Sequence, residues 1–442
     1  RWRADFGGDT YALFSGFLED IRPLPGIGAL AKAELVAFGS LTYVNRDGLS
    51  VPMQTNKATG DLVDIVLDQV GWPEDMRDVD TGLERDVRAR VVVGALGVWS
   101  DVLHEMAGVP SPFRVQASKG VHILVPRDRI DSDTGLILRT EKSVLFVIPW
   151  GEHWVVGTTD TPWDLALDHP AATRSDIDYI LDRVNEVLRR PLTDDDIVGV
   201  YVGLRPLLAP SDTASAATTK LSREHQVAQA IPGLVAVAGG KYTTYRVMAK
   251  DAVDEAVHGL EGTLGRRVEP CVTENVPLLG ADGYQAMWNQ RRTVGTRAGL
   301  HVGRVEHLLE RYGTLISEVL ELIERDSSLG EPLPGAEDYL KAEIRYAVTH
   351  EGARHLDDVL TRRTRISIET FDRGVAAAPH VADLVAEALG WDDAQRQKEI
   401  DHYVKRVEAE RQSQQMPDDE TADAARMGAP DVVPVSTASP TA

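Results

Sequence analysis

The sequence predicts a mixed α/β fold, α+β in part, that is followed by a C-terminal all-α domain. A strand, a glycine turn and a helix follow one another twice, starting at about Val87 and at Leu234. Between these two units, over residues 114–207, β-rich segments alternate with turns, as in a mixed sheet. Helical periodicity then dominates residues 282–407.

The composition narrows the classes of protein to consider. The chain has 442 residues, which allows two or three domains at roughly 150 residues each and a sizeable core without disulfides. A hydrophobic content of 43% and a charged content of 26% exclude a disordered or fibrous protein. The formal net charge of −22 disfavours general nucleic-acid binding, because no basic field covers the chain.

Cysteine usage and hydropathy indicate the compartment. A single cysteine, Cys271, excludes an intrachain disulfide framework and a CxxC site, which fits a reducing compartment. No window approaches the roughly 18 consecutive apolar residues of a membrane-spanning helix. The sequence therefore predicts a cytoplasmic protein.

The first strand–turn–helix unit begins a region of clear order. Residues 87–93 are expected to form a buried strand, Gly94 to Gly97 a turn, and a helix starts at Ser100. Residues 1–86 show no sustained periodicity. The segment at residues 26–31 matches G-x-G-x-x-A, but the preceding residues include two prolines and three charges, so we do not expect the buried parallel strand of a dinucleotide site.

The next elements form the predicted mixed layer. Strands are expected at residues 121–125, 143–150 and 154–157, with a hairpin loop at 151–153. A helix with apolar residues at helical spacing interrupts them at residues 175–188. The polar stretch at residues 210–217 is expected to be an exposed loop.

The second strand–turn–helix unit and the helical region complete the chain. Leu234 to Ala238 read as a buried strand, followed by paired glycines and a helix from Tyr242. Beyond Gln412 the polar, aperiodic chain is predicted to be disordered. His350 and His355 resemble the zinc motif HExxH but are one residue too far apart to share a helix face, so no metal is predicted.

Arg205, between a glycine and a proline at Gly203 and Pro206, is the first candidate for a ligand contact. We expect the two flanking residues to hold it in a stiff turn, where its planar fork could grip a phosphate or carboxylate. An ordinary surface arginine in a turn is the alternative.

The paired glycines Gly239 and Gly240, with Lys241 after them, are the second candidate. Glycines let a ligand approach the backbone, and the free N–H groups of the next helix face a negative oxygen, which suits a flavin edge or a phosphate. The alternative is a tight turn capped by Thr243 or Thr244.

His122, which follows the sequence Ser118-Lys119-Gly120, is the third candidate. We interpret this segment as a cationic turn that enters a strand. A histidine on a sheet face could accept a proton from a substrate hydroxyl near neutral pH. The alternative is a hydrogen-bonded structural histidine.

Taken in order, these motifs make the sequence from about Val87 to about Glu410 resemble the FAD-dependent glycerol-3-phosphate dehydrogenases, especially the actinobacterial form. The resemblance covers about three-quarters of the chain. The segments that carry it are VVVGALGVWSD (91–101), SKGVH (118–122), FVIPW (146–150), GTTD (157–160), GLRPL (203–207), LSREH (221–225), GGKYTTYR (239–246) and the helical stretch 343–365. The family's N-terminal strand, G-x-G-x-x-G turn and helix, which hold the FAD diphosphate, are not found among residues 1–86.

The resemblance implies a remnant of an FAD-dependent oxidoreductase two-domain fold, with a mixed-sheet substrate layer and a C-terminal all-α domain. It gives the following division of the chain: a divergent N-terminal region (1–86), a flavin-domain segment (87–110), a substrate-binding α+β layer (111–230), a second flavin-domain segment (231–275), a C-terminal helical domain (276–411) and a disordered tail (412–442).

The activity that the resemblance implies is oxidation of sn-glycerol 3-phosphate to dihydroxyacetone phosphate. The C2 hydrogen would leave as hydride to FAD while a base takes the hydroxyl proton, and the electrons would pass to a quinone. A non-catalytic truncated homologue that acts through partner binding, or a glycerol-3-phosphate oxidase, is the alternative.

The resemblance also implies roles for individual residues. Arg205 would lie near the reacting hydroxyl and Arg223 would bind the substrate phosphate. Lys241 would sit between substrate and flavin, and His122 would lie near the reacting centre. Arg205, His122 and Lys241 are thus the expected catalytic residues, and the three cations Arg205, Arg223 and Lys241 are expected to converge on the dianionic substrate.

Cofactor and partners follow from the same resemblance. The residues expected to bind FAD are Gly97, Gly239, Gly240, Lys241, Thr243 and Thr244. The implied partners are the phosphate substrate, a quinone and a peripheral contact with the inner face of the cytoplasmic membrane, and a homo-oligomer is left open. Anionic lipid would repel a surface with net charge −22, so such a contact needs an apolar or locally basic patch.

Overall fold

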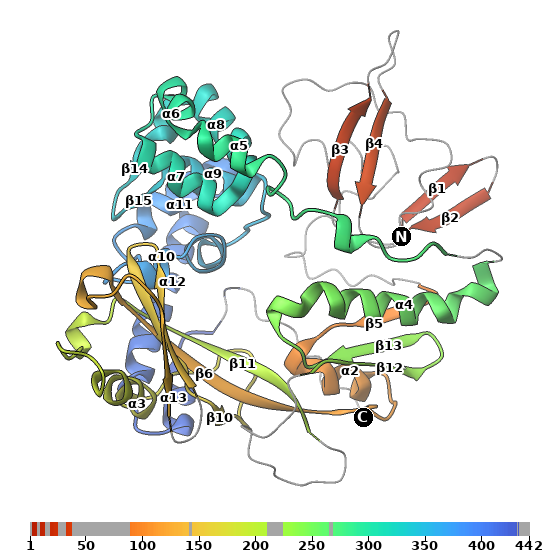
Figure 1. Cartoon of the computed structure of the whole chain (residues 1–442), viewed down its shortest axis with the longest axis horizontal. Helices are drawn as coiled ribbons and strands as arrows, with labels where there is room; N and C mark the ends of the chain where they lie inside the picture. The colour runs from red at the N-terminus through yellow and green to blue at the C-terminus, as the bar shows by residue number, and fades with distance from the viewer. Residues whose placement is uncertain are drawn as a thin grey trace. The chain divides into compact units, whose positions relative to one another are not determined.

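The structure is a computed structural model, and it describes most of the chain after residue 88 (Figure 1). The described ranges are 89–140, 144–209, 224–264, 268–430 and 432, without the side chains of 259 and 261–264, together with the backbone of four N-terminal strands. The chain divides into two compact units. The first contains residues 1–90, 277–330 and 345–352, and the second contains 91–276, 331–344 and 353–442.

Four strands and four helices make up most of the described part of the first unit. The strands form two antiparallel hairpins, β1 (Trp2–Phe6) with β2 (Asp9–Leu13) and β3 (Leu18–Leu24) with β4 (Lys32–Ala37). The sequence does not predict these strands, and the G-x-G-x-x-A segment lies between β3 and β4, outside the described residues. The helices are α5 (Tyr284–Asn289), α6 (Arg291–Ala298), α7 (Val302–Tyr312) and α8 (Ile316–Arg325).

Helical spacing of apolar residues explains why α7 and α8 bury one face each. Val305, Leu308 and Leu309 lie on one stripe of α7 and are almost completely buried. Ile316 and Val319 form the corresponding stripe of α8. The helical character predicted for this part of the sequence is therefore confirmed.

The second unit contains the predicted mixed sheet. Its strands are β6 (Arg114–Pro126), β7 (Leu136–Arg139), β8 (Val144–Trp150), β9 (His153–Gly157), β10 (Thr161–Pro162) and β11 (Gly199–Ala209). Their order is β10-β6-β9-β8-β7, and β11 pairs antiparallel with the other edge of β6. The hairpin predicted at residues 151–153 joins β8 to β9. Figure 1 shows β6 and β11 running side by side as the longest strands of this sheet.

One face of this sheet carries the core of the layer. Helix α3 (Arg174–Asn185) begins with a capping box at Thr173 and buries Ile177 and Ile180. These residues pack with Val121 and Ile123 of β6, which alternate along the strand with the residues of the other face. Because residues 114–126 form one continuous strand, the cationic turn predicted before His122 is wrong.

A smaller sheet contains both strand–turn–helix units. β12 (Gln226–Ile231) pairs antiparallel with β13 (Leu234–Ala238), which pairs parallel with β5 (Val92–Gly94). A short 3₁₀ turn, η3 (Gly97–Trp99), and helix α2 (Ser100–Met106) follow β5. The corresponding turn after β13 is η7 (Tyr242–Thr244), which leads into α4 (Tyr245–Leu264). The first strand is shorter than predicted, since Val91 lies before it.

The remaining elements are mostly helical. A small hairpin of β14 (Pro332–Leu333) and β15 (Ala336–Leu340) precedes them. The helices are α9 (Lys341–Thr349), a π-helical turn at Asp358–Arg363, α10 (Ile366–Glu369), α11 (Ala378–Leu389), α12 (Asp393–Ser413) and α13 (Asp419–Arg426). None of the described helices combines the length and the apolarity needed to span a membrane.

The tail predicted to be disordered from residue 412 is wrong for residues 412–430. Helix α12 continues to Ser413, and α13 follows with Ala422 fully buried. Asp419 of α13 forms an ion pair with Lys119 of β6. Composition missed this helix because much of its attachment comes from charged residues paired with partners far away in the sequence. The other proposed domain boundaries stay predictions.

Candidate functional site

The candidate site lies on the face of β6 and β11 that points away from α3. Antiparallel register places three residue pairs opposite one another along this face. They are His122 with Tyr201, Gly120 with Gly203, and Ser118 with Arg205. Because side chains alternate along each strand, all six residues belong to the same face. Two glycines therefore lie between the aromatic pair and the pair that contains Arg205.

His122 is held in a fixed orientation by its neighbours. Its ring stacks on that of Tyr201, with 4.7 Å between the centroids and an interplanar angle of 8°. On the other side it occupies the space above Gly157, where a Cβ would lie 2.5 Å from His122 Cδ2. Nδ1 is buried and has no hydrogen-bond partner among the described residues. The predicted alternative, a hydrogen-bonded structural histidine, does not describe this nitrogen.

The environment of His122 keeps its imidazole neutral. Burial and the nearby Arg205 guanidinium together lower the pKa of His122 from 6.5 to about 4. A neutral ring at neutral pH has a free nitrogen lone pair, which can accept a hydrogen bond from a ligand hydroxyl. Burial and Arg205 disfavour the imidazolium, so a full proton transfer to His122 requires a nearby negative charge that offsets them. Burial also raises the pKa of the stacked Tyr201, which stays protonated.

Arg205 reaches across the sheet from β11. Nη2 donates to Thr158 Oγ1 at 2.9 Å and Nη1 donates to the carbonyl oxygen of Thr159 at 3.2 Å. The guanidinium lies over Gly120, where a Cβ would come within 2.6 Å of Nη1 and Cζ. The stiff turn predicted for this arginine is wrong, because Arg205 and Pro206 lie inside β11. Strand pairing, not the flanking proline, fixes its position.

On the opposite face of β6, the cationic side chain of Lys119 is buried and paired within the fold. Lys119 is 1% exposed, and its Nζ donates to Asp176 Oδ2 at 2.6 Å and to the carbonyl oxygen of Ala171 at 3.3 Å. Asp419 of α13 forms a second ion pair with the same Nζ, and the Trp163 ring lies 5.4 Å away. Its hydrogen bonds are satisfied within the fold, so Lys119 is a structural residue.

The glycine turns lie at the same edge of the smaller sheet. β5 and β13 are parallel, and a glycine turn follows each one, so both turns stand at the carboxyl ends of the strands. Ligands of α/β proteins bind at this edge. Gly97, Gly239 and Gly240 have φ values of 58°, 75° and 81°, which a side chain would strain.

The residues after Gly240 are open to a ligand. Lys241, Thr243 and Thr244 are exposed, and Tyr242 is 92% exposed. Thr244 Oγ1 accepts a hydrogen bond from the backbone N–H of Lys241 at 3.2 Å and donates to its carbonyl oxygen at 2.9 Å. The capped tight turn is therefore present, and it leaves the lysine side chain at the surface.

The structure brings together some of the predicted residues. His122 and Arg205 share one sheet face, whereas Lys241 lies in the turn between β13 and η7 of the other sheet. Arg223 lies outside the described residues, so convergence of the three cations stays a prediction. Sequence analysis missed Tyr201 and Thr158. The alternation Tyr201, Gly203, Arg205 along one strand could have indicated the first of these.

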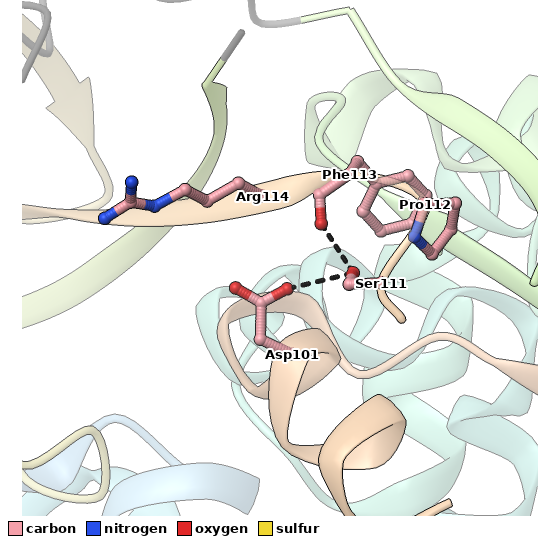
Figure 2. A pocket seen from close by; sticks show the side chains of 5 residues that line it. All are labelled: Asp101, Ser111, Pro112, Phe113 and Arg114. Carbon is pink, nitrogen blue, oxygen red and sulfur yellow. Dashed lines mark hydrogen bonds between the residues drawn. The ribbon is translucent and has the colours of Figure 1, made fainter. Parts of the chain in front are cut away.

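A pocket near the start of β6 contains none of the predicted residues. Figure 2 shows it lined by Asp101, Ser111, Pro112, Phe113 and Arg114. Asp101 accepts hydrogen bonds from Ser111 Oγ and from the backbone N–H of Val115, both at 3.2 Å. These bonds tie α2 to β6, which is a structural role for the carboxylate.

Two family models match the chain. Residues 61–246 match "FAD dependent oxidoreductase", and residues 271–396 match the C-terminal domain of alpha-glycerophosphate oxidase. The first match begins before Val87, where sequence analysis placed the start of the resemblance. It includes both His122 and Arg205.

Relatives of known name agree with these matches. The chain is 57% identical over 356 residues to glycerol-3-phosphate dehydrogenase 2 of Mycobacterium tuberculosis, a match that covers 80% of this chain and 60% of the relative. It is 32% identical over 333 residues to the mitochondrial glycerol-3-phosphate dehydrogenase of Homo sapiens, which covers 74% of this chain and 44% of the relative. The chain thus spans no more than about three-fifths of these relatives.

A solved structure supports the fold. The glycerol-3-phosphate dehydrogenase of Bacillus halodurans, complexed with FAD, is 26% identical and has a TM-score of 0.61, over 73% of this chain and 62% of that one. The predicted fold class, an oxidoreductase fold with mixed sheets and a C-terminal helical domain, is confirmed. The two family matches and the similar proteins together show that the chain belongs to the FAD-dependent oxidoreductases of the glycerol-3-phosphate dehydrogenase family.

Proposed function

We propose that the chain carries the substrate-oxidising site of a flavin-dependent glycerol-3-phosphate dehydrogenase, which converts sn-glycerol 3-phosphate to dihydroxyacetone phosphate. The observation that carries this proposal is the juxtaposition of a neutral, half-buried histidine, His122, with the guanidinium of Arg205 on one sheet face. A base and a cation are the two groups that oxidation of an anionic alcohol requires.

The described residues fit the cofactor that the family uses. Gly239 and Gly240 expose bare backbone at the carboxyl end of β13, and η7 and α4 follow directly. A Cβ at Gly97 would meet no heavy atom of the described residues within 4 Å, so this turn also leaves room for a ligand. We infer that these turns, with Lys241, Thr243 and Thr244, hold FAD. When bound, FAD supplies the acceptor for the C2 hydride.

The protein's own residues then have the following tasks. His122 accepts the hydroxyl proton of the substrate through a ring nitrogen, because its imidazole is neutral at pH 7. Arg205 stabilises the oxygen that gains negative charge as this proton leaves. Thr158 and Thr159 hold the guanidinium in place from the end of β9. Arg223 and Lys241 are proposed to contact the substrate phosphate and the substrate–flavin boundary.

The proposal is tested with the FAD-loaded chain and the variant His122→Gln. Removing a general base lowers the rate by about 10²–10⁴-fold. We expect a loss of this size in kcat/KM for sn-glycerol 3-phosphate, with bound flavin retained as measured by its visible absorption. His153→Gln, on the same sheet but outside the site, is the matched control. A loss smaller than about threefold would contradict the role of His122, since each tenfold corresponds to about 1.4 kcal/mol of transition-state stabilisation.

The electron acceptor is also a proposal. We infer that a quinone receives the electrons, as the resemblance implies. Turnover under nitrogen with a soluble quinone is expected, whereas a chain that needs air and produces hydrogen peroxide would be an oxidase instead. A chain that takes up no flavin would favour the non-catalytic alternative.

A cytoplasmic location with peripheral membrane contact is proposed as well. The net charge of −22 means that vesicles rich in anionic lipid should bind the chain less than neutral vesicles do. Flotation of the purified chain with vesicles of both compositions measures this difference.

A further inference from the structure

Gly203 is a glycine for which the described fold gives no reason. Its backbone lies in the middle of β11 and outside the left-handed region that favours glycine. A Cβ on Gly203 would meet no heavy atom of the described residues within 4 Å. Every other glycine with such an open Cβ position in the described part of the chain has a positive φ. Neither conformation nor packing there requires glycine at this position.

The neighbouring glycines on the same sheet face contrast with Gly203. A Cβ on Gly199, four residues earlier on β11, would lie 2.8 Å from the backbone carbonyl carbon and Cα of Ile368. A Cβ on Gly120, directly opposite Gly203, would collide with the guanidinium of Arg205. Packing within the fold therefore accounts for both of these glycines. Of these three glycines, only Gly203 has a Cβ position that no described residue contacts.

A glycine in a strand interior weakens the strand, because it has the largest conformational entropy to lose and no side chain to pack. The loss is about 0.5–1 kcal/mol relative to alanine. Where neither backbone geometry nor a neighbouring side chain calls for it, close approach of a ligand is a physical reason for a bare backbone. Gly203 is exposed, so a ligand can reach it.

The surroundings of Gly203 indicate what this ligand is. Tyr201 and the stacked His122 lie on one side along the strands, and Arg205 lies on the other. A hydroxyl oxygen over Gly203 thus has a proton acceptor on one side and a cation on the other. We propose that the backbone at Gly203 forms the floor on which the reacting end of a small polyol phosphate lies, so that this position limits the size of the substrate.

This inference rests on the proposed function, and it names a specificity-determining residue of that site. A methyl group at position 203 would occupy the floor and lift the substrate away from His122 and Arg205. The same methyl group would meet no described atom of the free protein. Substitution should therefore have opposite effects on stability and on binding.

The test uses Gly203→Ala and Gly203→Val in the FAD-loaded chain, with sn-glycerol 3-phosphate titrated by calorimetry. We expect an unchanged or higher melting temperature for both variants, because alanine and valine suit a strand better than glycine. The Kd should rise by about tenfold for Gly203→Ala and further for Gly203→Val. The control Ala230→Val adds two carbon atoms to β12, which belongs to the other sheet, and should change Kd by less than about twofold. This addition lies between the one carbon of Gly203→Ala and the three of Gly203→Val.

The outcomes separate this inference from the proposed function. Wild-type chain that binds no sn-glycerol 3-phosphate overturns both. Wild-type chain that binds it, with a Kd that Gly203→Val leaves unchanged, overturns the inference alone. A lower melting temperature for Gly203→Ala also overturns it, because the glycine would then have a packing role. Loss of bound flavin with unchanged substrate binding would place the cofactor over Gly203 and contradict the proposal.

Discussion

The two faces of strand β6 differ in the partners that they provide for a polar side chain. On one face Lys119 is buried and is bound by two carboxylates, a carbonyl and an aromatic ring. On the other face, three residues further along, His122 has a buried Nδ1 with no partner among the described residues. The first face is satisfied by the protein itself. The second leaves a buried ring nitrogen without a hydrogen-bond partner among the described residues.

This difference distinguishes a structural polar group, Lys119, from His122, for which we propose a functional role. Buried polar groups in folded proteins nearly always have hydrogen-bond partners, so an unpartnered one needs an explanation. Lys119 and His122 both belong to the motif SKGVH (118–122), and the sequence alone does not show which of them is structural. They differ in their partners, which for Lys119 come from α3, α13 and the segment before α3. Perturbing each face should therefore affect different properties.

The largest effect is expected from Lys119→Met. Removing the cation leaves Asp176, which is 6% exposed, as an uncompensated buried charge. Breaking a buried pair in this way costs about 3–5 kcal/mol. Chemical denaturation measures the change in the free energy of unfolding. The control Lys250→Met removes an exposed pair with Asp254 and should cost less than about 1 kcal/mol. Equal losses would contradict a structural role for Lys119.

The next effect compares two glycines on the same face of β11, Gly199 and Gly203. Gly199→Ala places a methyl group against the backbone of Ile368, which cannot move aside like a side chain. We expect a loss of about 1–3 kcal/mol in the free energy of unfolding. Gly203→Ala on the same face should instead be neutral or stabilising. If both variants lose the same stability, part of the protein packs over Gly203 in solution.

A pH dependence should report the environment of His122. Its pKa is about 4 in the folded protein and about 6.5 in the unfolded chain. Between these values the unfolded state binds the additional proton, so stability is full above pH 6.5 and falls as the pH decreases toward 4. From pH 7 to pH 4.5 this group should remove about 2–3 kcal/mol.

His122→Gln isolates that contribution, because it cannot titrate. The difference in unfolding free energy between pH 7 and pH 4.5 should be smaller in this variant than in the wild type. Chemical denaturation at both pH values makes the comparison. Identical pH dependences would mean that His122 is not buried as described.

The smallest effect is expected at Tyr201, which positions His122 by stacking. Tyr201→Phe keeps the aromatic face and should change kcat for sn-glycerol 3-phosphate by less than about twofold. Tyr201→Leu removes the stacked pair, which contributes about 0.5–1.5 kcal/mol, and should lower kcat several-fold. KM should change little, since Arg205 remains in place. Equal behaviour of both variants would show that stacking does not position the histidine.

Much of the fold could be predicted from local pattern. The apolar run at Leu234–Ala238, the paired glycines and the following helix give a strand–turn–helix unit that the structure confirms. His122 and Arg205 were also found in the sequence, as a histidine near a strand start and an arginine beside a proline. Their setting was not predicted correctly, because the turns expected around both residues are interior positions of two paired strands.

The sequence by itself determined the element types, the helical C-terminal part and a short set of residues able to do chemistry, because periodicity and side-chain type are local properties. Tertiary structure decided which of them meet. The register between β6 and β11 sets His122 beside Tyr201, and helix α13 reaches Lys119 from 300 residues away. Pairing register and long-range ion pairs are relations between distant segments, and no short window of sequence contains them.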